Sequence, residues 1–550
     1  MNLANLGLSG LNAAQNRLQT AGHNINNAAT DGFNRQSVLV QTAGATSTGV
    51  GYIGRGVQAV TVQRSYDGFL ARQLVNAQSN GAALVSYGNE ISQVNNLFAD
   101  RTVGITPALQ KFFDGVQAVA TAPADSAARQ ELLGRASSLV SQINDANAFL
   151  DSQRSNINTQ ITTTVTQINS YVERVRDLNN QITTARATSS NHEPNDLLDQ
   201  RDQLVSELSQ LVDVKVLEQN GNFNLTVGNG QVLLGGDTVF PLVAQPSAAD
   251  PSRTVISYTA VGSGGKKLTV EMSESSIKGG TLGGLITYRR DSLDAVQNSL
   301  GRLAAGLATA VNGIHATGED LNGVPGGAFF ALRPITPIPG AKNAGSAVIG
   351  VEFQDVNQLS GQDYRIEYDG ANYIATSIPN GTITALKPNA DGKATLDGLT
   401  FDLSAGAAAQ GDSWLVQPTR AAAGGLSLAI NDPAKIAAAG VDTGTANGDV
   451  ALALAKLQTD KVLGNGTMSL NEAYSQIVNK VGVQTQQNAT AAKAQAALIQ
   501  QNFAAQQAVS GVNLDEEYVN LTRYTEQYSA AARLIEVSSN LFDTLLGLRT

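Results

Sequence analysis

The sequence predicts a multidomain α+β protein with paired terminal coiled-coil helices, an elongated helical bundle and two inserted β-rich outer domains. Three patterns predict this architecture. Apolar residues recur every three or four positions at both chain ends, long central stretches carry one such stripe, and two blocks alternate apolar and polar residues between turns that contain glycine. The predicted units are a terminal coiled-coil assembly domain at 1–64 and 510–550, a helical rod at 65–211, 285–322 and 446–509, a first β-rich domain at 212–284, and a second β-rich outer domain at 323–445.

The composition narrows the functional classes. The chain has 550 residues, enough for about three or four domains. Its net charge of −10 opposes binding to nucleic acid, and the absence of cysteine excludes disulfides, thiolate metal sites and cysteine nucleophiles. No segment approaches the ~20 apolar residues of a membrane span. Asparagine and glycine interrupt the N-terminal residues, so we expect no cleaved secretory signal.

The last helix is predicted over Leu514 to Leu546. Asn513 can accept a backbone N–H as its N-cap, and Glu516 occupies the capping-box position. A helix of this length spans roughly 50 Å at about 1.5 Å per residue. Burial of its apolar side chains yields on the order of 10 kcal/mol gross, and the cost of ordering the helix offsets much of this gain, so we expect a helix that needs a partner. The apolar seam comprises Leu514, Tyr518, Leu521, Thr525, Tyr528, Ala532, Ile535, Ser539, Phe542 and Leu546, and a second stripe comprises Leu534, Val537, Leu541, Leu545 and Leu548.

The opposite chain end supplies a candidate partner helix with the same apolar spacing. An asparagine-rich segment follows it, so the helix should end near Ala28 or Ala29. Two interpretations stay open: the termini pair only to close the molecule, or the paired termini also pack against neighbouring subunits. Apolar residues on two faces of the last helix favour the second interpretation. The apolar residues of the first helix are Leu11, Ala14, Leu18, Ala21, Ile25 and Ala28.

Helical spacing also dominates the rod. Ile157 to Ile182 carries one apolar stripe among polar residues, and Leu197 to Leu211 continues the bundle. The spacing returns from Leu293 to Ile314. Ser469 and Glu472 then form a predicted capping box, which marks the start of another long helix.

The two β-rich blocks are recognised by a change of period. From Val212 the apolar residues alternate, and Asn220-Gly221 and Asn229-Gly230 are typical hairpin turns. The second block alternates in the same way over Tyr364 to Tyr368, and a turn at Asp369-Gly370 follows. Both blocks are inserted between helical segments, so we expect them to lie on the outside of the rod.

No sequence pattern predicts catalysis or a metal site, and we expect neither enzyme activity nor a cofactor. His23, His192 and His315 are far apart and lie outside ligand motifs. The acidic turn at Asp320 lacks the full array of a calcium-binding loop. The GxGxxG match at 49–54 leads into a predicted strand, whereas a dinucleotide site needs a helix there. A carboxylate pair of the glycosidase type stays an alternative.

Several stretches resemble axial proteins of the bacterial flagellum. Ser9 to Gln36 resembles the N-terminal signature shared by rod, hook and hook-associated proteins, and Ser510 to Leu546 resembles their C-terminal signature. In the middle, Asn195 to Val212, NDLLDQRDQLVSELSQLV, is similar to the family of first hook-associated proteins, which form the first junction zone between hook and filament. Asn220 to Val232 and Pro123 to Leu150 resemble the same family.

The resemblance implies a structural protein that leaves the cell through the flagellar type III apparatus without cleavage. It implies a homo-oligomeric ring at the distal end of the hook, in contact with the hook subunit and the second hook-filament junction protein. Terminal segments that become a coiled coil on assembly, and an export chaperone on the C-terminal helix, are further implications. By matching motif, the assembly interface comprises Leu11, Leu18, Ile25, Gly32, Phe33, Leu514, Tyr518, Leu521, Tyr528, Ile535, Phe542 and Leu546.

Two alternatives stay open at this point. Another axial protein, such as the hook subunit or the second junction protein, would share the termini but should lack the NDLLDQRDQL segment. A secreted glycan-binding protein or enzyme would place its function in residues 330–445, which match no pattern that the sequence alone identifies.

Overall fold

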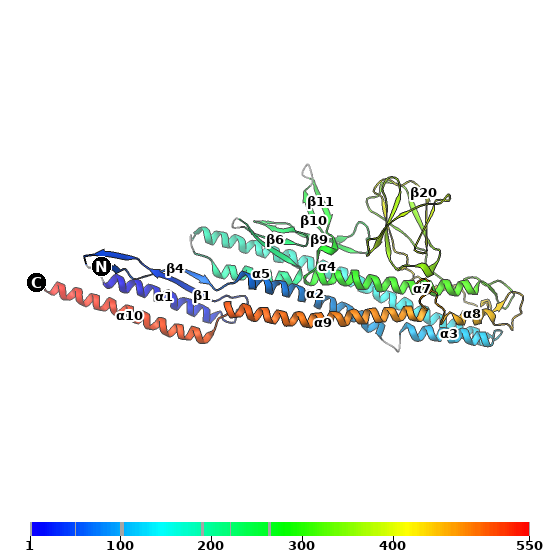
Figure 1. Ribbon diagram of the computed structural model, residues 1–550, viewed down its shortest axis with the longest axis horizontal. Coiled ribbons are helices and arrows are strands. Elements are labelled where there is room, and N and C mark those ends of the chain that lie inside the picture. The colour runs from blue at the N-terminus through cyan, green and yellow to red at the C-terminus, as the bar shows by residue number, and fades with distance from the viewer. Residues whose placement is uncertain are drawn as a thin grey trace.

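The protein is an elongated molecule with both chain ends at one tip (Figure 1). The computed structural model describes residues 3–49, 51–99, 104–188, 192–219, 222–261 and 266–548. Long helices run along the main axis, and the larger β-rich regions project from one side of them (Figure 1). Terminal helices, a helical body and several β-rich regions form the mixed architecture that the sequence predicts.

The tip of the molecule consists of two helices and one long hairpin. α1 (Leu3–Asn26) ends slightly earlier than expected, because the side chain of Asn27 donates a hydrogen bond to the His23 carbonyl oxygen at 3.0 Å. α10 (Leu514–Gly547) begins at the predicted cap, where Asn513 accepts two backbone N–H groups. The hairpin strands are β1 (Gln36–Thr42), β2 (Ala45–Thr48), β3 (Gly51–Gly54) and β4 (Val57–Arg64). β1 pairs antiparallel with β4 near α1, and β2 pairs antiparallel with β3 in the outer half of the hairpin.

The body is a bundle of long helices. Its central helix, α4, is 63 residues long and buries the whole predicted stripe from Ile157 to Ile182. α9 begins with the predicted capping box of Ser469 and Glu472 and ends at Ser510, with Gly511 as its C-cap. The helices of the body are α2 (Gly68–Ala99), α3 (Ile105–Thr121), α4 (Ser126–Thr188), α5 (Asn195–Leu211), α6 (Gly280–Tyr288), the π-helix η2 (Arg289–Leu293), α7 (Asp294–His315), α8 (Asp449–Lys456) and α9 (Leu470–Ser510).

The first β-rich region packs on α4 and shares its core. It contains a four-stranded sheet in the order β5-β6-β7-β8 and a three-stranded sheet in the order β11-β10-β9. Asn220 and Gly221, where a turn was predicted, lie outside the described residues. The elements are β5 (Val214–Gln219), β6 (Asn222–Val227), β7 (Gln231–Gly235), β8 (Thr238–Val239), β9 (Leu242–Pro246), β10 (Thr254–Val261), β11 (Lys267–Glu271) and the 3-10 turn η1 (Glu274–Ser276).

The second β-rich region has a core of its own, built around the buried Phe401 and Trp414. A five-stranded sheet in the order β14-β21-β16-β17-β18 faces a three-stranded sheet in the order β15-β20-β19, and two short pairs connect the region to the body. The elements are β12 (Gly318–Glu319), β13 (Phe330–Ala331), β14 (Ile338–Pro339), β15 (Val348–Phe353), η3 (Val356–Gln358), β16 (Asp363–Tyr368), β17 (Tyr373–Ile378), β18 (Ile383–Leu386), β19 (Lys393–Leu396), β20 (Leu399–Ala405), β21 (Ser413–Val416), β22 (Ser427–Leu428), η4 (Pro433–Lys435) and β23 (Ala439–Gly440).

Candidate assembly interface

α1 and α10 run antiparallel and in contact at the tip of the molecule (Figure 1). Near the start of α1, a methyl group on Gly7 would come within 2.8 Å of Ile535 Cγ1 and 3.0 Å of the Ala531 carbonyl oxygen. Further along α1, the Arg17 guanidinium lies over the ring of Tyr524, 5.4 Å from its centre. Glycine in α1 therefore permits a close approach of the two helices that a larger residue would prevent.

Within one copy, other parts of the chain bury a face of α10 that is offset by one residue from the predicted apolar seam. Its buried residues are Glu517, Ala531 and Ser538, which are separated by multiples of seven, whereas the predicted seam contains Tyr518, whose exposed fraction is 54%. Ala531 and Ser538 are small enough to admit α1, and Glu517 is buried because it pairs with Arg35. A search for large apolar residues could not find this face, since none of its buried residues is one.

The residues of the predicted assembly interface divide by their exposure within one copy. Phe33 packs edge-on against His23, with 5.4 Å between the ring centres, and Gly32 has a φ of +78° next to Gln203 of α5. Both of these lie at the base of the tip rather than between the terminal helices. Half-buried members of the set are Leu11, Leu18, Ile25, Phe33, Leu521 and Ile535, and exposed members are Gly32, Leu514, Tyr518, Tyr528, Phe542 and Leu546.

The last turns of α10 extend beyond the start of α1 (Figure 1). Phe542 follows Ile535 by seven residues, so it continues the α1-facing side of the helix, yet 59% of it is exposed. Contiguous apolar surface of this kind is typical of protein interaction sites. The exposed apolar residues at this end are Leu534, Val537, Leu541, Phe542, Leu545, Leu546 and Leu548.

The tip is joined to the body by the N-terminal part of α5. Asp199 accepts hydrogen bonds from the Asn34 backbone N–H at 2.9 Å and from the Asn34 amide at 2.6 Å. Arg64, the last residue of the hairpin, bridges Asp199 and Asp202, each at 2.8 Å. Burial raises the pKa of Asp199, an effect that the hydrogen bonds from Asn34 and Arg64 oppose. The NDLLDQRDQL segment, which the sequence marks only by resemblance, is thus the docking site for the chain's own N-terminal segment.

Arg35 connects the segment that follows α1 to the C-terminal helices α9 and α10. Its backbone N–H donates to the Ser510 carbonyl oxygen at 2.8 Å, which ties it to the end of α9. Its guanidinium contacts Glu517 at 2.7 Å and Glu516 at 2.9 Å, so Glu516 forms an ion pair instead of the predicted capping box. The sequence gives no signal for this contact, because the partners are more than 400 positions apart.

The contact between the tip and the body is largely polar. A cavity of about 580 Å³ lies between the segment around Gly32 and the helices α4 and α5, and Asp177, Asp196 and Gln203 are among its lining residues. Across the edge of this cavity, His23 Nε2 lies 3.1 Å from the Asp196 carboxylate. The orientation of the tip on the body therefore depends on directional hydrogen bonds, which specify geometry more sharply than apolar packing does.

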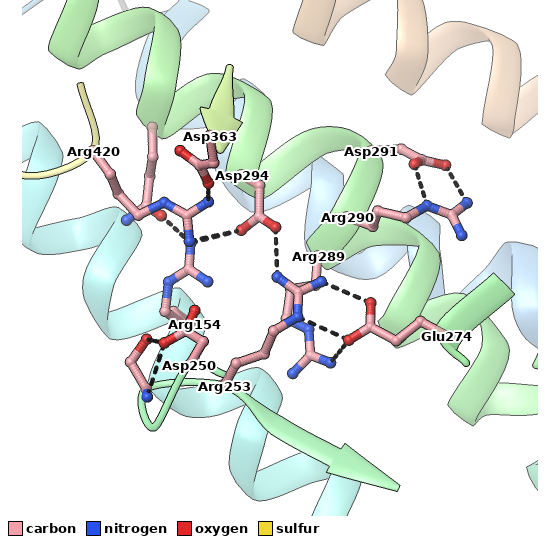
Figure 2. A network of polar contacts seen from close by, with 12 residues as sticks. Arg154, Asp250, Arg253, Glu274, Arg289, Arg290, Asp291, Asp294, Asp363 and Arg420 are labelled. Atoms are coloured by element: carbon pink, nitrogen blue, oxygen red, sulfur yellow. Dashed lines mark hydrogen bonds and ion pairs between the residues drawn. The ribbon is translucent and has the colours of Figure 1, made fainter. Parts of the chain in front are cut away.

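A buried network of charges joins both large β-rich regions to the body (Figure 2). Its centre is Asp294 at the start of α7, which contacts Arg154 of α4 at 2.7 Å and Arg253 at 2.7 Å. Arg253 precedes β10 of the first β-rich region. Arg420, from the second β-rich region, lies 3.7 Å from the same carboxylate and also pairs with Asp363 of β16.

The pKa shifts in this network follow its charges. Burial alone would raise the pKa of Asp294, but the guanidinium groups of Arg420, Arg253 and Arg154 outweigh it and hold the pKa well below its ordinary value. Asp363 has a single guanidinium partner, and burial raises its pKa to about 6. Asp294 is thus the carboxylate whose negative charge the fold requires.

The first β-rich region adds a third carboxylate, Glu274, to the network. It contacts Arg253 and Arg289 at 2.7 Å each (Figure 2). Burial lowers the pKa of Arg289 to about 10. The sequence offers no signal for these pairs, since Arg253, Glu274 and Arg289 come from three separate segments and are brought together only by the fold.

Within the described ranges, no group of three or more histidine, cysteine, aspartate or glutamate side chains is placed to hold a metal ion. Across the same part of the chain, no helix is both long and apolar enough to cross a membrane. His315 is buried, with Nδ1 2.8 Å from the Gly327 carbonyl oxygen and Nε2 accepting the Ala437 N–H at 2.8 Å, and burial lowers its pKa. It is a structural histidine of the core.

Comparisons with known proteins match all parts of the chain. Residues 91–330 match the family model described as flagellar hook-associated protein FlgK helical domain, and residues 338–418 match a flagellar hook-associated protein 1, D2-like domain. Residues 499–548 match the flagellar basal body rod FlgEFG protein C-terminal model. The match at 338–418 supplies a family for the block that the sequence alone left unassigned.

Relatives extend over the full length. A protein named flagellar hook-associated protein 1 from Salmonella typhimurium is 38% identical over the whole of both chains, and one of the same name from Escherichia coli is 36% identical, again over both chains. A solved structure of the flagellar hook junction protein FlgK from Burkholderia pseudomallei is 31% identical, with a TM-score of 0.74, and covers 80% of this chain and all of that one.

Proposed function

The chain belongs to the flagellar hook-associated protein 1 family and has a structural role at the hook-filament junction; we propose that it assembles there through its terminal helices. The observation that carries this proposal is the exposed apolar surface at the end of α10, where no helix among the described residues covers Phe542. A second copy that covers this surface removes it from water, which favours assembly. The relatives named flagellar hook-associated protein 1 support a structural role.

The proposed assembly is a homo-oligomeric ring at the distal end of the hook. One side of the ring contacts the hook subunit and the other contacts the second hook-filament junction protein. The terminal helices of neighbouring copies then form a coiled-coil core, and the exposed apolar members of the predicted set on α10, Leu514, Tyr518, Tyr528, Phe542 and Leu546, supply its contacts between copies. The larger β-rich regions project from one side of the body, so they can fill the outer layer while the tips meet at the axis (Figure 1).

The same apolar surface suits a transient partner before assembly. We assign the end of α10, with Leu541 and Leu545 exposed, as the site that an export chaperone covers in the cytoplasm. The protein then leaves the cell without cleavage of its N-terminus, and its final location is the external flagellum. A helix whose outer side is open over most of its length is stabilised chiefly when a partner covers it.

Electron microscopy of cells that lack this protein, with flagellin assayed in the medium, tests the proposal. We expect complete hooks that bear no filament, together with flagellin released outside the cell. Missing hooks would instead make the chain a rod or hook component. Filaments of normal length and number would refute the role at the junction.

A single substitution tests the assembly surface itself. Phe542→Asp places a charge on a side chain that is 59% exposed, so the monomer should keep its fold while the ring fails to form. Ile383→Asp is the matched control, because Ile383 is 71% exposed but lies on β18 of the second β-rich region. We expect filaments in cells with the control variant and bare hooks in cells with Phe542→Asp; filaments in both would contradict the assigned surface.

A further inference from the structure

The outer half of the hairpin at the tip has no packing partner within the described chain. Every residue of β2 and β3 is exposed, and a methyl group added at Gly44 or Gly54 would meet no atom within 4 Å. An isolated two-stranded hairpin is only marginally stable in water. Yet this one displays Tyr52 with an exposed fraction of 81% and Ile53 with 49%.

The charges of the two terminal segments are complementary. Residues 1–64 contain four arginines and one aspartate, a net charge of +3, whereas residues 510–550 contain three arginines and six carboxylates, a net charge of −3. Within one copy, Arg17 lies over Tyr524, Arg35 pairs with Glu516 and Glu517, and Arg64 pairs with α5. Within the described chain Arg17 and Arg55 form no ion pair, but Arg17 is covered by its contact with Tyr524. Arg55, in the hairpin, is therefore the arginine of residues 1–64 whose guanidinium meets neither a carboxylate nor an aromatic ring in the described chain.

The position of Arg55 along the molecule points to its counterpart. The Val57 N–H lies 3.4 Å from Ser9 Oγ of α1, and Gly7 of α1 is level with Ile535 of α10. The hairpin runs beside α1 toward the chain ends (Figure 1). At about 3.3 Å per strand residue and about 1.5 Å per helix residue, Arg55 lies about 4 Å beyond the level of Ile535, and Glu536 is the carboxylate of α10 nearest to that level.

The end of the hairpin that contains Tyr52 lies level with the last turns of α10. Ile53 and Tyr52 lie about 7 Å and about 10 Å further along the hairpin than Arg55, on the level of the turn between Leu541 and Leu545 of α10. These two leucines are 50% and 66% exposed. Within one copy α1 contacts both the hairpin and α10, so the hairpin end is about one helix diameter from its own α10.

We propose that the hairpin end of one copy docks on the outer face of α10 of a second copy, with Tyr52 and Ile53 against Leu541 and Leu545 and with Arg55 paired to Glu536. The inference rests on the proposed ring and names the contact that closes it. Because the two surfaces of the contact differ, each copy can present one to each neighbour, which is the heterologous geometry that generates rings. An aromatic residue and an arginine in one patch are also the residue types that dominate binding energy at interfaces.

Cysteine cross-linking tests this contact directly, because the natural chain contains no cysteine. Tyr52→Cys and Leu541→Cys are made as separate variants and co-expressed in cells that lack the wild-type chain, and isolated flagella are oxidised. We expect a disulfide-linked dimer from the co-expressed pair that neither variant yields alone. Tyr52→Cys with Ile383→Cys is the control pair and should give no dimer. Flagella with normal filaments but no dimer from the first pair would overturn the proposal.

Charge reversal separates this contact from the function as a whole. Arg55→Glu should reduce the number of filaments per cell, and Glu536→Arg in the same chain should restore it, since each contact then has opposite charges again. Loss with Arg55→Glu that Glu536→Arg fails to restore contradicts this pairing. If the wild-type chain itself does not restore filaments to cells that lack it, the proposed function fails, whatever the hairpin contacts.

Discussion

Removal of the central carboxylate of the buried network should destabilise the protein far more than removal of a surface charge. Asp294→Asn preserves the shape of the side chain but leaves Arg154, Arg253 and Arg420 facing an uncharged amide. Asp294 is 14% exposed, and two of the guanidinium groups lie 2.7 Å from it. Breaking a buried ion pair by removing one partner costs about 3–5 kcal/mol, and we expect the free energy of unfolding to fall by that amount.

The chain contains its own control for this substitution. Asp291, three residues before Asp294, pairs with Arg290 at 2.6 Å, but the side chains of the pair are 42% and 34% exposed (Figure 2). Exposed pairs contribute about 0–1 kcal/mol, so Asp291→Asn should change the free energy of unfolding by no more than that. Both variants remove one formal negative charge, and the comparison therefore isolates the effect of burial.

Urea unfolding followed by two signals provides the assay. Trp414 is the single tryptophan of the chain and is buried in the second β-rich region, so its fluorescence reports on that region, while circular dichroism reports mainly on the helical body. We expect Asp294→Asn to shift the fluorescence transition to lower urea concentration, because Arg420 of that region loses a partner. A shift no larger than that of Asp291→Asn, about 1 kcal/mol or less, would refute the assignment of Asp294 as the centre of the network.

Two further predictions concern the second β-rich region and the tip. Burial raises the pKa of Asp363 to about 6, above its value of 3.8 in the unfolded chain. The ionised form of Asp363 therefore lowers the free energy of unfolding at pH 7. This lost stability is recovered as the pH falls from about 6 toward 4, because the folded protein then binds the proton more tightly than the unfolded chain does. Wild type should therefore gain stability relative to Asp363→Asn over that range in urea unfolding, and parallel pH profiles would contradict this. Gly7→Ala should speed hydrogen exchange in α10, because the added methyl group crowds Ile535. Gly22→Ala is the control and should leave the exchange unchanged, because a methyl group there meets no atom within 4 Å. Equal exchange in the two variants would argue against the close contact between the helices.

Interactions between residues close in sequence could be predicted, whereas interactions between distant residues could not. Features that depend on neighbouring residues were predicted well: the cap at Asn513, the capping box of Ser469 and Glu472, and the buried stripe from Ile157 to Ile182 are all present in the structure. Each rests on spacing of three or four residues, which backbone geometry makes meaningful without knowledge of the fold. The family resemblance likewise rested on contiguous segments.

What the tertiary structure decided is which of these elements meet, and through which side chains. The sequence indicated that the two terminal helices could pair, but the buried face of α10 contains Glu517 and Ser538, whose role depends on Arg35 and on a glycine-containing α1. The network at Asp294 draws on residues from four distant segments. Hydrophobic periodicity in the sequence identifies the surfaces that become buried. A charged side chain can be buried only where an oppositely charged or hydrogen-bonding partner contacts it, and the fold determines which residue that partner is.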